Sequence, residues 1–217
     1  DALRYIQIAQ HGYQNISDTA FFPLFPLLIK GVALLFGNHA YWLAALLVSN
    51  AALFGALFIL YQVATDALGE QVGHRTILYL CIFPTAFFFF AGYNESLFLL
   101  FSCSSLFALR RQRWVIAGVL GLLAALTRSA GAILILPYLY ELWLARDEAR
   151  PGLWKKLLEL FPRALPIVLI PLGTLFYSIF CWRQFGDPLA FATVQKFWQR
   201  SFTLPWTGII DSFVQFF

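Results

Sequence analysis

Long apolar stretches without charged residues alternate with short polar segments along this chain. No Asp, Glu, Lys or Arg occurs in residues 31–65, 76–94 or 164–182. At about 1.5 Å of rise per residue, a helix over any of these stretches could cross a hydrocarbon core about 30 Å thick. The pattern predicts membrane helices over residues 40–62, 76–92, 95–109 and 163–181.

Prolines interrupt two of the apolar segments, residues 21–36 and residues 76–92. Residues 1–20 are mixed and polar, and residues 21–36 are apolar but interrupted by Pro23 and Pro26. That pattern favours interfacial or re-entrant helices over a full span. Pro84 predicts a kink within residues 76–92, which neighbouring helices can accommodate.

Residues 114–144 allow two interpretations. One continuous helix would be about 46 Å long and would put Arg128 in mid-membrane. Two short helices that turn near residues 127–131 would place Arg128 at a membrane surface or in a wet cavity. We favour the hairpin, which gives six membrane helices or so, two of them short.

The distribution of basic residues supports the hairpin. The densest basic segments are Arg110–Arg113 and the stretch with Arg146, Arg150, Lys155, Lys156 and Arg163. The hairpin puts both on one side, with the loop at residues 66–75, and the positive-inside rule makes that side cytoplasmic. One long helix would separate them. Residues 1–18, 93–95, 127–129 and 182–201 then lie on the opposite, outer side.

Composition excludes a soluble domain. Hydrophobic residues make up 60% of the 217 and charged residues 12%, about half the charge density of soluble domains. The net charge of +4 does not indicate nucleic-acid binding, because the basic residues cluster at helix ends. Cys81, Cys103 and Cys181 lie in apolar segments without paired spacing, which is typical of core residues.

We therefore expect an all-α integral membrane protein, a polytopic helical bundle. Residues 1–217 would form a single transmembrane domain. Residues 1–39 would form an outer loop with interfacial helices, residues 40–182 the membrane helices, and residues 183–217 another outer loop and the start of a further segment. The chain starts without Met, so we expect a fragment of a longer protein.

The candidate chemistry lies on the outer face, where both signs of charge converge. Carboxylates beside Arg in a shallow polar cavity suit a substrate with a phosphate and a hydroxyl to activate. Each residue also has a simpler interpretation: Asp1 as a solvated loop carboxylate, Glu95 as a helix-start residue, Arg128 as the partner of Glu95 in a structural salt bridge, and His11 as a loop residue. No glycine-rich phosphate loop, His/Cys cluster or Ser-His-Asp arrangement is present in the sequence.

Four blocks in order resemble the PIG-V mannosyltransferases. The segment around residues 1–13 is similar to that family's first outer loop, and residues 20–27 (AFFPLFPL) to its AFFPLYPLL block. Residues 83–98 resemble its P-x-A-x-F and Y-x-E-S-L-F blocks. Residues 123–131 (LAALTRSAG) resemble its L-A-x-L-T-R-S-N-G block, with Ala130 in place of the usual Asn. Beyond Pro162 the resemblance thins to residues 185–188.

The resemblance implies a GT-C-like fold and a glycosyltransferase that moves mannose from a polyprenyl-phosphate-mannose donor to a lipid or glycan acceptor. The family's acidic residue in the first outer loop maps to Asp1, which we expect to be the catalytic base of an inverting reaction. The expected substrate-binding residues are Arg4, His11, Asp18, Asn94, Glu95, Arg128 and Arg183. We expect no metal and no cofactor, and membrane lipid rather than nucleic acid as the surroundings.

The resemblance also bears on location. We expect the bacterial inner membrane, or the endoplasmic reticulum with GPI-anchor-like biosynthesis if the source is eukaryotic, with the active site on the outer or luminal face. Two other functions stay open at this point. A transporter or lipid flippase would have broken helices with midplane charges, and a scaffold subunit would leave the outer polar residues without a purpose.

Overall fold

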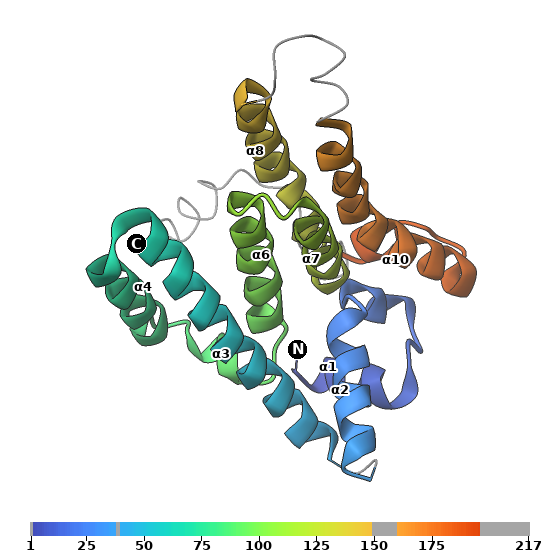
Figure 1. Ribbon diagram of the computed structural model, residues 1–217. Coiled ribbons are helices and arrows are strands. Elements are labelled where there is room, and N and C mark those ends of the chain that lie inside the picture. The colour runs from blue at the N-terminus through green and yellow to red at the C-terminus, as the bar shows by residue number, and fades with distance from the viewer. Residues whose placement is uncertain (1, 38–39, 149–159, 196–217) are drawn as a thin grey trace, which may run out of the picture.

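The computed structural model describes residues 2–37, 40–148 and 160–195, and the regular elements in these ranges are all helices (Figure 1). Two described helices are long and apolar enough to cross a membrane, α3 (Tyr41–Leu68) and the helical segment Leu160–Phe185. Residue positions 1, 150, 155 and 156, which carry charged side chains named above, lie outside the described residues.

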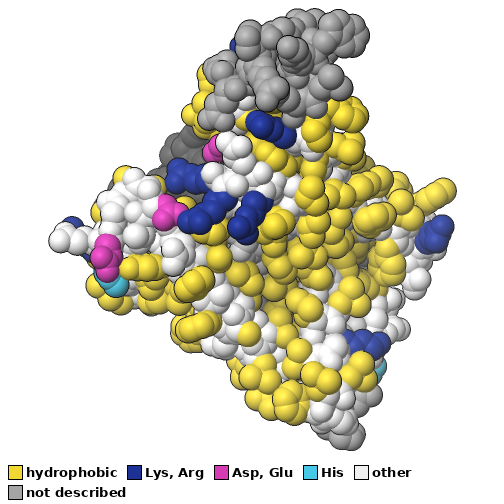
Figure 2. Space-filling view, viewed as in Figure 1, with side chains coloured by type: hydrophobic (Ala, Val, Ile, Leu, Met, Phe, Trp, Pro, Cys, Tyr) yellow, Lys and Arg dark blue, Asp and Glu magenta, His cyan; other side chains and the backbone are white. Residues whose placement is uncertain are grey.

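The described surface is unusually apolar. Side chains such as Phe54, Leu35 and Leu136 are more than half exposed, and apolar side chains cover the middle of the face in Figure 2. Contiguous apolar surface on this scale marks contact with lipid or a partner rather than with water. This surface and the two membrane-length helices indicate a membrane protein, whereas the full count of membrane helices stays a prediction.

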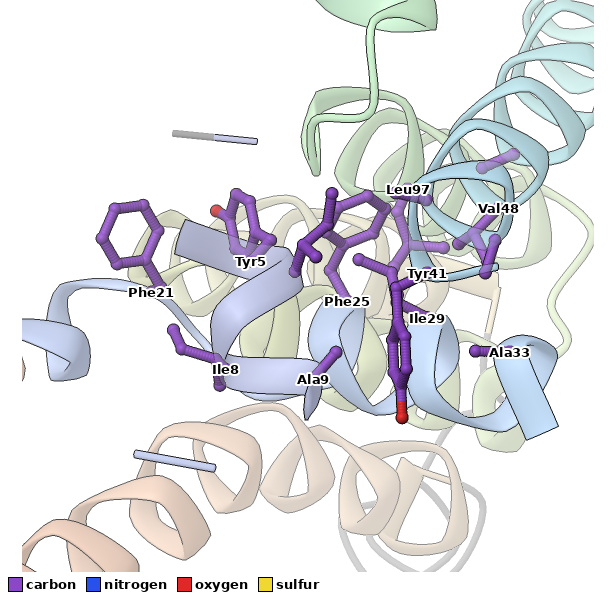
Figure 3. Close-up of a cluster of buried hydrophobic side chains, with 14 residues drawn as sticks. Tyr5, Ile8, Ala9, Phe21, Phe25, Ile29, Ala33, Tyr41, Val48 and Leu97 are labelled. Atoms are coloured by element: carbon purple, nitrogen blue, oxygen red, sulfur yellow. The ribbon is translucent and has the colours of Figure 1, made fainter. Parts of the chain in front are cut away.

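The N-terminal segment forms a helical layer of its own. It contains α1 (Ala2–His11), the short 3-10 helix η1 (Ile16–Ala20) and α2 (Leu24–Leu35). The 12 residues of α2 span about 18 Å, which is too short to cross a membrane. Apolar side chains of α1 and α2 pack against α3 and Leu97 in one buried cluster (Figure 3).

The region around Pro84 breaks the helix rather than kinking it. The predicted span at residues 76–92 is divided between α4 (Glu70–Ile82) and α5 (Phe87–Phe90). Phe83, directly before the proline, has extended backbone (φ −63°, ψ 137°), as the ring of a following proline requires. The expected single span is therefore wrong in its boundaries: helix begins six residues earlier and stops before Pro84.

The chain reverses at Arg128, which confirms the hairpin interpretation. α6 (Glu95–Arg110) leads into α7 (Trp114–Thr127), the 3-10 helix η2 (Ser129–Leu134) and α8 (Ile135–Glu148). The Tyr138 hydroxyl of α8 donates to the carbonyl oxygens of Trp114 at 3.3 Å and Arg163 at 2.8 Å. α8 has therefore returned to the level where α7 begins, so one continuous helix over residues 114–144 is wrong.

Each end of the helical bundle has its own ion pair. At one end Arg111 pairs with Asp66 at 2.9 Å, beside exposed Arg110 and Arg113. At the other end Arg128 pairs with Glu95. The predicted grouping of residues 66–75 with the basic segment, and of residues 93–95 with 127–129, is confirmed.

The last described helices lie against the N-terminal segment at the end of the bundle that holds the Arg128–Glu95 pair. α10 (Leu169–Phe185), preceded by the 3-10 turn η3 (Leu165–Val168), ends at Gly186, whose left-handed φ of 76° suits glycine. The short helix α11 (Ala190–Thr193) follows. The buried Tyr177 hydroxyl donates to the carbonyl oxygens of Thr19 at 2.9 Å and Phe21 at 3.2 Å, which fixes α10 against η1.

Candidate functional site

A cavity of about 430 Å³ lies where the N-terminal layer meets the turns before α6 and after α7. We call it the Glu95–Arg128 cavity. Its walls come from α1, the segment after η1, residues 93–95, residues 127–129 and α11. The lining residues include Tyr5, Phe21, Phe22, Tyr93, Asn94, Glu95, Thr127, Arg128, Ser129, Phe191 and Gln195. Segments more than 180 residues apart in the sequence thus share one site.

An ion pair provides the charge of this cavity. Arg128 Nη1 lies 2.9 Å from Glu95 Oε1, and the two side chains are 43% and 28% exposed. Glu95 is the first residue of α6, where the helix dipole favours a negative charge. Its other oxygen, Oε2, is buried and has no hydrogen-bond partner among the described residues. Buried polar atoms in folded proteins nearly always have partners, and this oxygen can accept a further hydrogen bond.

One buried hydrogen bond links the two turns that carry the ion pair, and a backbone hydrogen bond closes the turn after α7. The buried Asn94 amide donates to the Thr127 carbonyl oxygen at 2.9 Å, and the Gly131 N–H donates to the Arg128 carbonyl oxygen at 2.9 Å. Gly92 supplies the left-handed backbone (φ 78°) of the turn before α6. The Asn94–Thr127 bond therefore joins the two backbone segments that carry Glu95 and Arg128, and separating them would leave a buried amide without its partner.

Close packing at Gly131 brings η2 back over α7. A Cβ atom added to Gly131 would lie 2.3 Å from the backbone nitrogen of Ala125. Only glycine therefore allows the chain to fold this tightly after Arg128.

Tyr5 closes another wall of the cavity. Its ring packs edge-on against Phe21 and Phe25, with centroids 5.0 Å apart in both pairs (Figure 3). Burial raises the pKa of the Tyr5 hydroxyl above its usual value, and the nearby negative charge of Glu95 raises it further. The hydroxyl therefore stays protonated at physiological pH and can donate a hydrogen bond.

Arg4, His11 and Asp18 lie in a second cavity, of about 520 Å³, which we call the polar hollow. Asp18 is almost fully buried, and its Oδ2 accepts the backbone N–H groups of Gln14 at 3.1 Å and Asn15 at 2.9 Å. Its Oδ1 lies 3.5 Å from Arg4 Nη1. Asp18 thus has a structural role in holding the loop before η1, in addition to the substrate contact predicted for it.

The predicted substrate-binding residues do not all lie in one cavity. Asn94, Glu95 and Arg128 share one cavity, Arg4, His11 and Asp18 share the other, and Arg183 is exposed on the last turn of α10 and lines neither. Asp1 lies outside the described residues. Its sequence neighbour Ala2 lies beside the turn that leads to Glu95, because the Ala2 Cβ is 4.0 Å from the position of a Cβ on Gly92.

Several lining residues were not predicted. Tyr5 lies within the same sequence block as Asp1, so the resemblance could have drawn attention to it. Phe191 and Gln195 carry no signal in the sequence, since only the tertiary contact of α11 with η1 brings them to the cavity. Within residues 2–37, 40–148 and 160–195, no three His, Cys, Asp or Glu side chains form a metal-binding group.

Comparison with known proteins agrees with the resemblance in the sequence. A family described as "Mannosyltransferase (PIG-V)" matches residues 1–146. GPI alpha-1,6-mannosyltransferase 2 of Rattus norvegicus is 37% identical over 61% of this chain and 29% of the relative. The protein of that name from Cricetulus griseus is 32% identical over 94% of this chain and 40% of the relative.

A fungal relative also matches almost the whole chain. GPI mannosyltransferase 2 of Schizosaccharomyces pombe is 26% identical over 95% of this chain and 48% of the relative. The chain therefore spans less than half the length of each of these three relatives. No solved structure matches it. The family match covers the segments that build the Glu95–Arg128 cavity up to Ser129, and the chain belongs to the PIG-V mannosyltransferase family.

Proposed function

We propose that this chain transfers mannose from a polyprenyl-phosphate-mannose donor to a lipid or glycolipid acceptor on the non-cytoplasmic face of a membrane. The supporting observation is the Glu95–Arg128 cavity. It combines a cation that can face a phosphate with a carboxylate oxygen, Glu95 Oε2, that can accept a hydrogen bond from a sugar hydroxyl. Membership of a mannosyltransferase family supports the sugar, and the names of two relatives specify an α-1,6 linkage, which we also propose here.

The proposed reaction is a single inverting displacement. An acceptor hydroxyl attacks the anomeric carbon of mannose, and the bond from that carbon to the phosphate oxygen breaks. The acceptor proton passes to Asp1 as general base, and the electron pair leaves with the lipid phosphate. Asp1 is placed in this role by the resemblance, and the position of Ala2 beside Gly92 is compatible with it.

Arg128 would stabilise the charge that develops on the leaving phosphate. The ion pair with Glu95 uses one of its five N–H groups, so several donors remain for phosphate oxygens. A fixed cation aimed at developing charge is a major source of rate acceleration, and we propose that it acts here without a metal. Glu95 Oε2 and Asn94 would hold the transferred sugar. Arg183 stays a predicted substrate contact outside this cavity.

The proposed orientation follows from the two ends of the bundle. The end with Arg110, Arg111 and Arg113 would face the cytoplasm under the positive-inside rule. The Glu95–Arg128 cavity would then open on the outer side of a bacterial inner membrane, or on the luminal side in a eukaryotic cell. A lipid-linked donor and acceptor could both reach it from the bilayer.

The direct test of Asp1 supplies radiolabelled polyprenyl-phosphate-mannose and a native lipid extract to membranes that contain the protein. We expect label in a lipid product with the wild type and its loss with Asp1→Asn, with Asp66→Asn at the opposite end as the matched control. Transfer that survives in Asp1→Asn would remove Asp1 from the role of base. No transfer by folded wild type in a competent extract would contradict the proposed activity and favour a transporter.

A further inference from the structure

An apolar groove lies beside the polar hollow, and the two have lining residues in common. It has a volume of about 500 Å³ and runs between α2 and α10. Its lining is mostly apolar, including Pro23, Leu27, Phe176 and Phe180, with Lys30 and Gln184 among its polar members. His11, Gly12 and Gln14 line both the groove and the polar hollow. A polar site and an apolar site that share a wall match a ligand with a polar head and an apolar chain.

The chemistry of the hollow fits a neutral, hydroxyl-rich head group. Gln7 and Gln10 are exposed on one face of α1, and neither side chain has a hydrogen bond among the described residues. A side-chain amide both donates and accepts, which matches the hydroxyl groups of a sugar. The one buried carboxylate, Asp18, is balanced by Arg4, so the hollow has no strong preference for an anion.

The groove fits an alkyl chain. Leu27 is 62% exposed and Phe176 is 54% exposed, although both lie in a recess rather than on a flat face. Apolar side chains around a slot in a membrane protein can hold a lipid chain, because the slot is as apolar as the bilayer that the chain leaves.

The hollow lies next to the proposed reaction site. Arg4 and Tyr5 are adjacent on α1, and the first lines the polar hollow while the second lines the Glu95–Arg128 cavity. A glycan held by Gln7 and Gln10 could therefore extend past α1 toward Glu95. A ligand that contained only a lipid chain and a phosphate would leave the amides of the hollow without partners.

We propose that a glycolipid acceptor binds across α1, with its alkyl chain in the apolar groove and its glycan in the polar hollow. Its reacting hydroxyl then points toward the Glu95–Arg128 cavity. The identification of this lipid as the acceptor rests on the proposed function. The binding site itself is defined by the polar hollow and the apolar groove, which have lining residues in common. It assigns the groove to the acceptor and not to the lipid of the donor.

The test is lipid binding, measured by native mass spectrometry of the full chain in detergent. The probes are monomannosyl dioleoylglycerol, plain dioleoylglycerol and polyprenyl phosphate. We expect the mannosyl lipid to bind more tightly than dioleoylglycerol. The double variant Gln7→Ala/Gln10→Ala should weaken binding of the mannosyl lipid about three- to tenfold for each hydrogen bond lost and leave dioleoylglycerol unchanged.

A second variant tests the groove. Leu27→Trp fills the slot and should weaken binding of both glycerolipids, whereas Leu35→Trp, at an exposed position that does not line the groove, should not. Gln71→Ala, an exposed glutamine on α4, is the control for the double variant. None of these side chains is buried, so all variants should fold.

Two results would overturn the inference. Unchanged binding of the mannosyl lipid in both test variants would remove the site. Loss of polyprenyl phosphate binding in Leu27→Trp would assign the groove to the donor. Because binding is measured without turnover, failure here is distinct from failure of the transfer assay, which tests the proposed function.

Discussion

Glu95 uses its two carboxylate oxygens differently. Oε1 accepts a hydrogen bond from Arg128 at 2.9 Å, and Oε2 is buried without a partner among the described residues. A structural salt bridge between half-exposed groups contributes little to stability and would explain Oε1 only. An acceptor at Oε2 fits the substrate contact that we propose for Glu95.

Replacing Glu95 with Gln tests that interpretation. Glu95→Gln keeps the size of the side chain but removes the charge, and a hydrogen bond to a charged group contributes about 1.5–3 kcal/mol. We expect mannosyl transfer to fall about tenfold or more, with thermal stability little changed. Glu70→Gln, at an exposed position on α4 beside His74, should leave transfer intact. Full activity of Glu95→Gln would contradict a substrate contact.

The charged residues of the site could be predicted from the sequence better than the groups that surround them. Glu95 and Arg128 could be predicted because ionisable groups beside apolar helices need a partner or a purpose. The backbone N–H groups that occupy Asp18 could not, because the loop before η1 has no pattern that specifies its turn.

The elements that form the site are short helices joined by tight turns. α7 has 14 residues, so it ends where Arg128 can face a cavity rather than lipid. The turn after it depends on the close approach of Gly131 to Ala124 and Ala125. The position of Arg128 is therefore a property of the turn as well as of the residue.

Alanine at Gly131 should disturb that turn. The added Cβ would lie 2.3 Å from the Ala125 nitrogen, and overpacking of this kind costs about 1–3 kcal/mol. We expect Gly131→Ala to lower the melting temperature in detergent and to reduce transfer, because Arg128 moves with the turn.

Gly31 provides the matched control on α2. No atom lies within 4 Å of a Cβ added there, and alanine favours a helix over glycine by up to about 1 kcal/mol. Gly31→Ala should keep or raise the melting temperature. Equal behaviour of the two variants would show that the packing of η2 on α7 does not hold the site together.

Helix boundaries were predicted well where polar residues mark them. The predicted helix over residues 95–109 differs from α6 by one residue, because Asn94 and the arginine cluster bracket it. α3 continues six residues past its predicted end to Leu68, since residues 63–68 contain no glycine or proline to end the helix before Gly69. The break at Pro84 was predicted only as a kink.

The whole molecule has two chemically distinct ends. Lys and Arg side chains gather toward the upper part of the view in Figure 2, and the Arg111–Asp66 pair belongs to the basic end. The Glu95–Arg128 cavity and the polar hollow belong to the other. The sequence predicted this separation from charge and length alone, whereas the contact of α10 with η1 needed the tertiary structure.

Sidedness can be measured with single cysteines in a background without Cys81, Cys103 and Cys181. Gln10→Cys, in the polar hollow, should react with a membrane-impermeant maleimide added from outside to intact cells. Gln71→Cys, on α4, should react only after the membrane is permeabilised. The reverse pattern would contradict the proposed orientation and put the cavity in the cytoplasm.

Arg128 is the residue whose removal should affect transfer most if the Glu95–Arg128 cavity is the site of mannosyl transfer. Membranes with wild type, Arg128→Ala or Arg110→Ala would receive radiolabelled polyprenyl-phosphate-mannose and a native lipid extract. We predict that Arg128→Ala lowers the rate of label transfer by about 100-fold or more, as loss of a transition-state contact does. Arg110→Ala, at the basic end, should transfer at the wild-type rate. Undiminished transfer by Arg128→Ala would show that the Glu95–Arg128 cavity is not the site of mannosyl transfer.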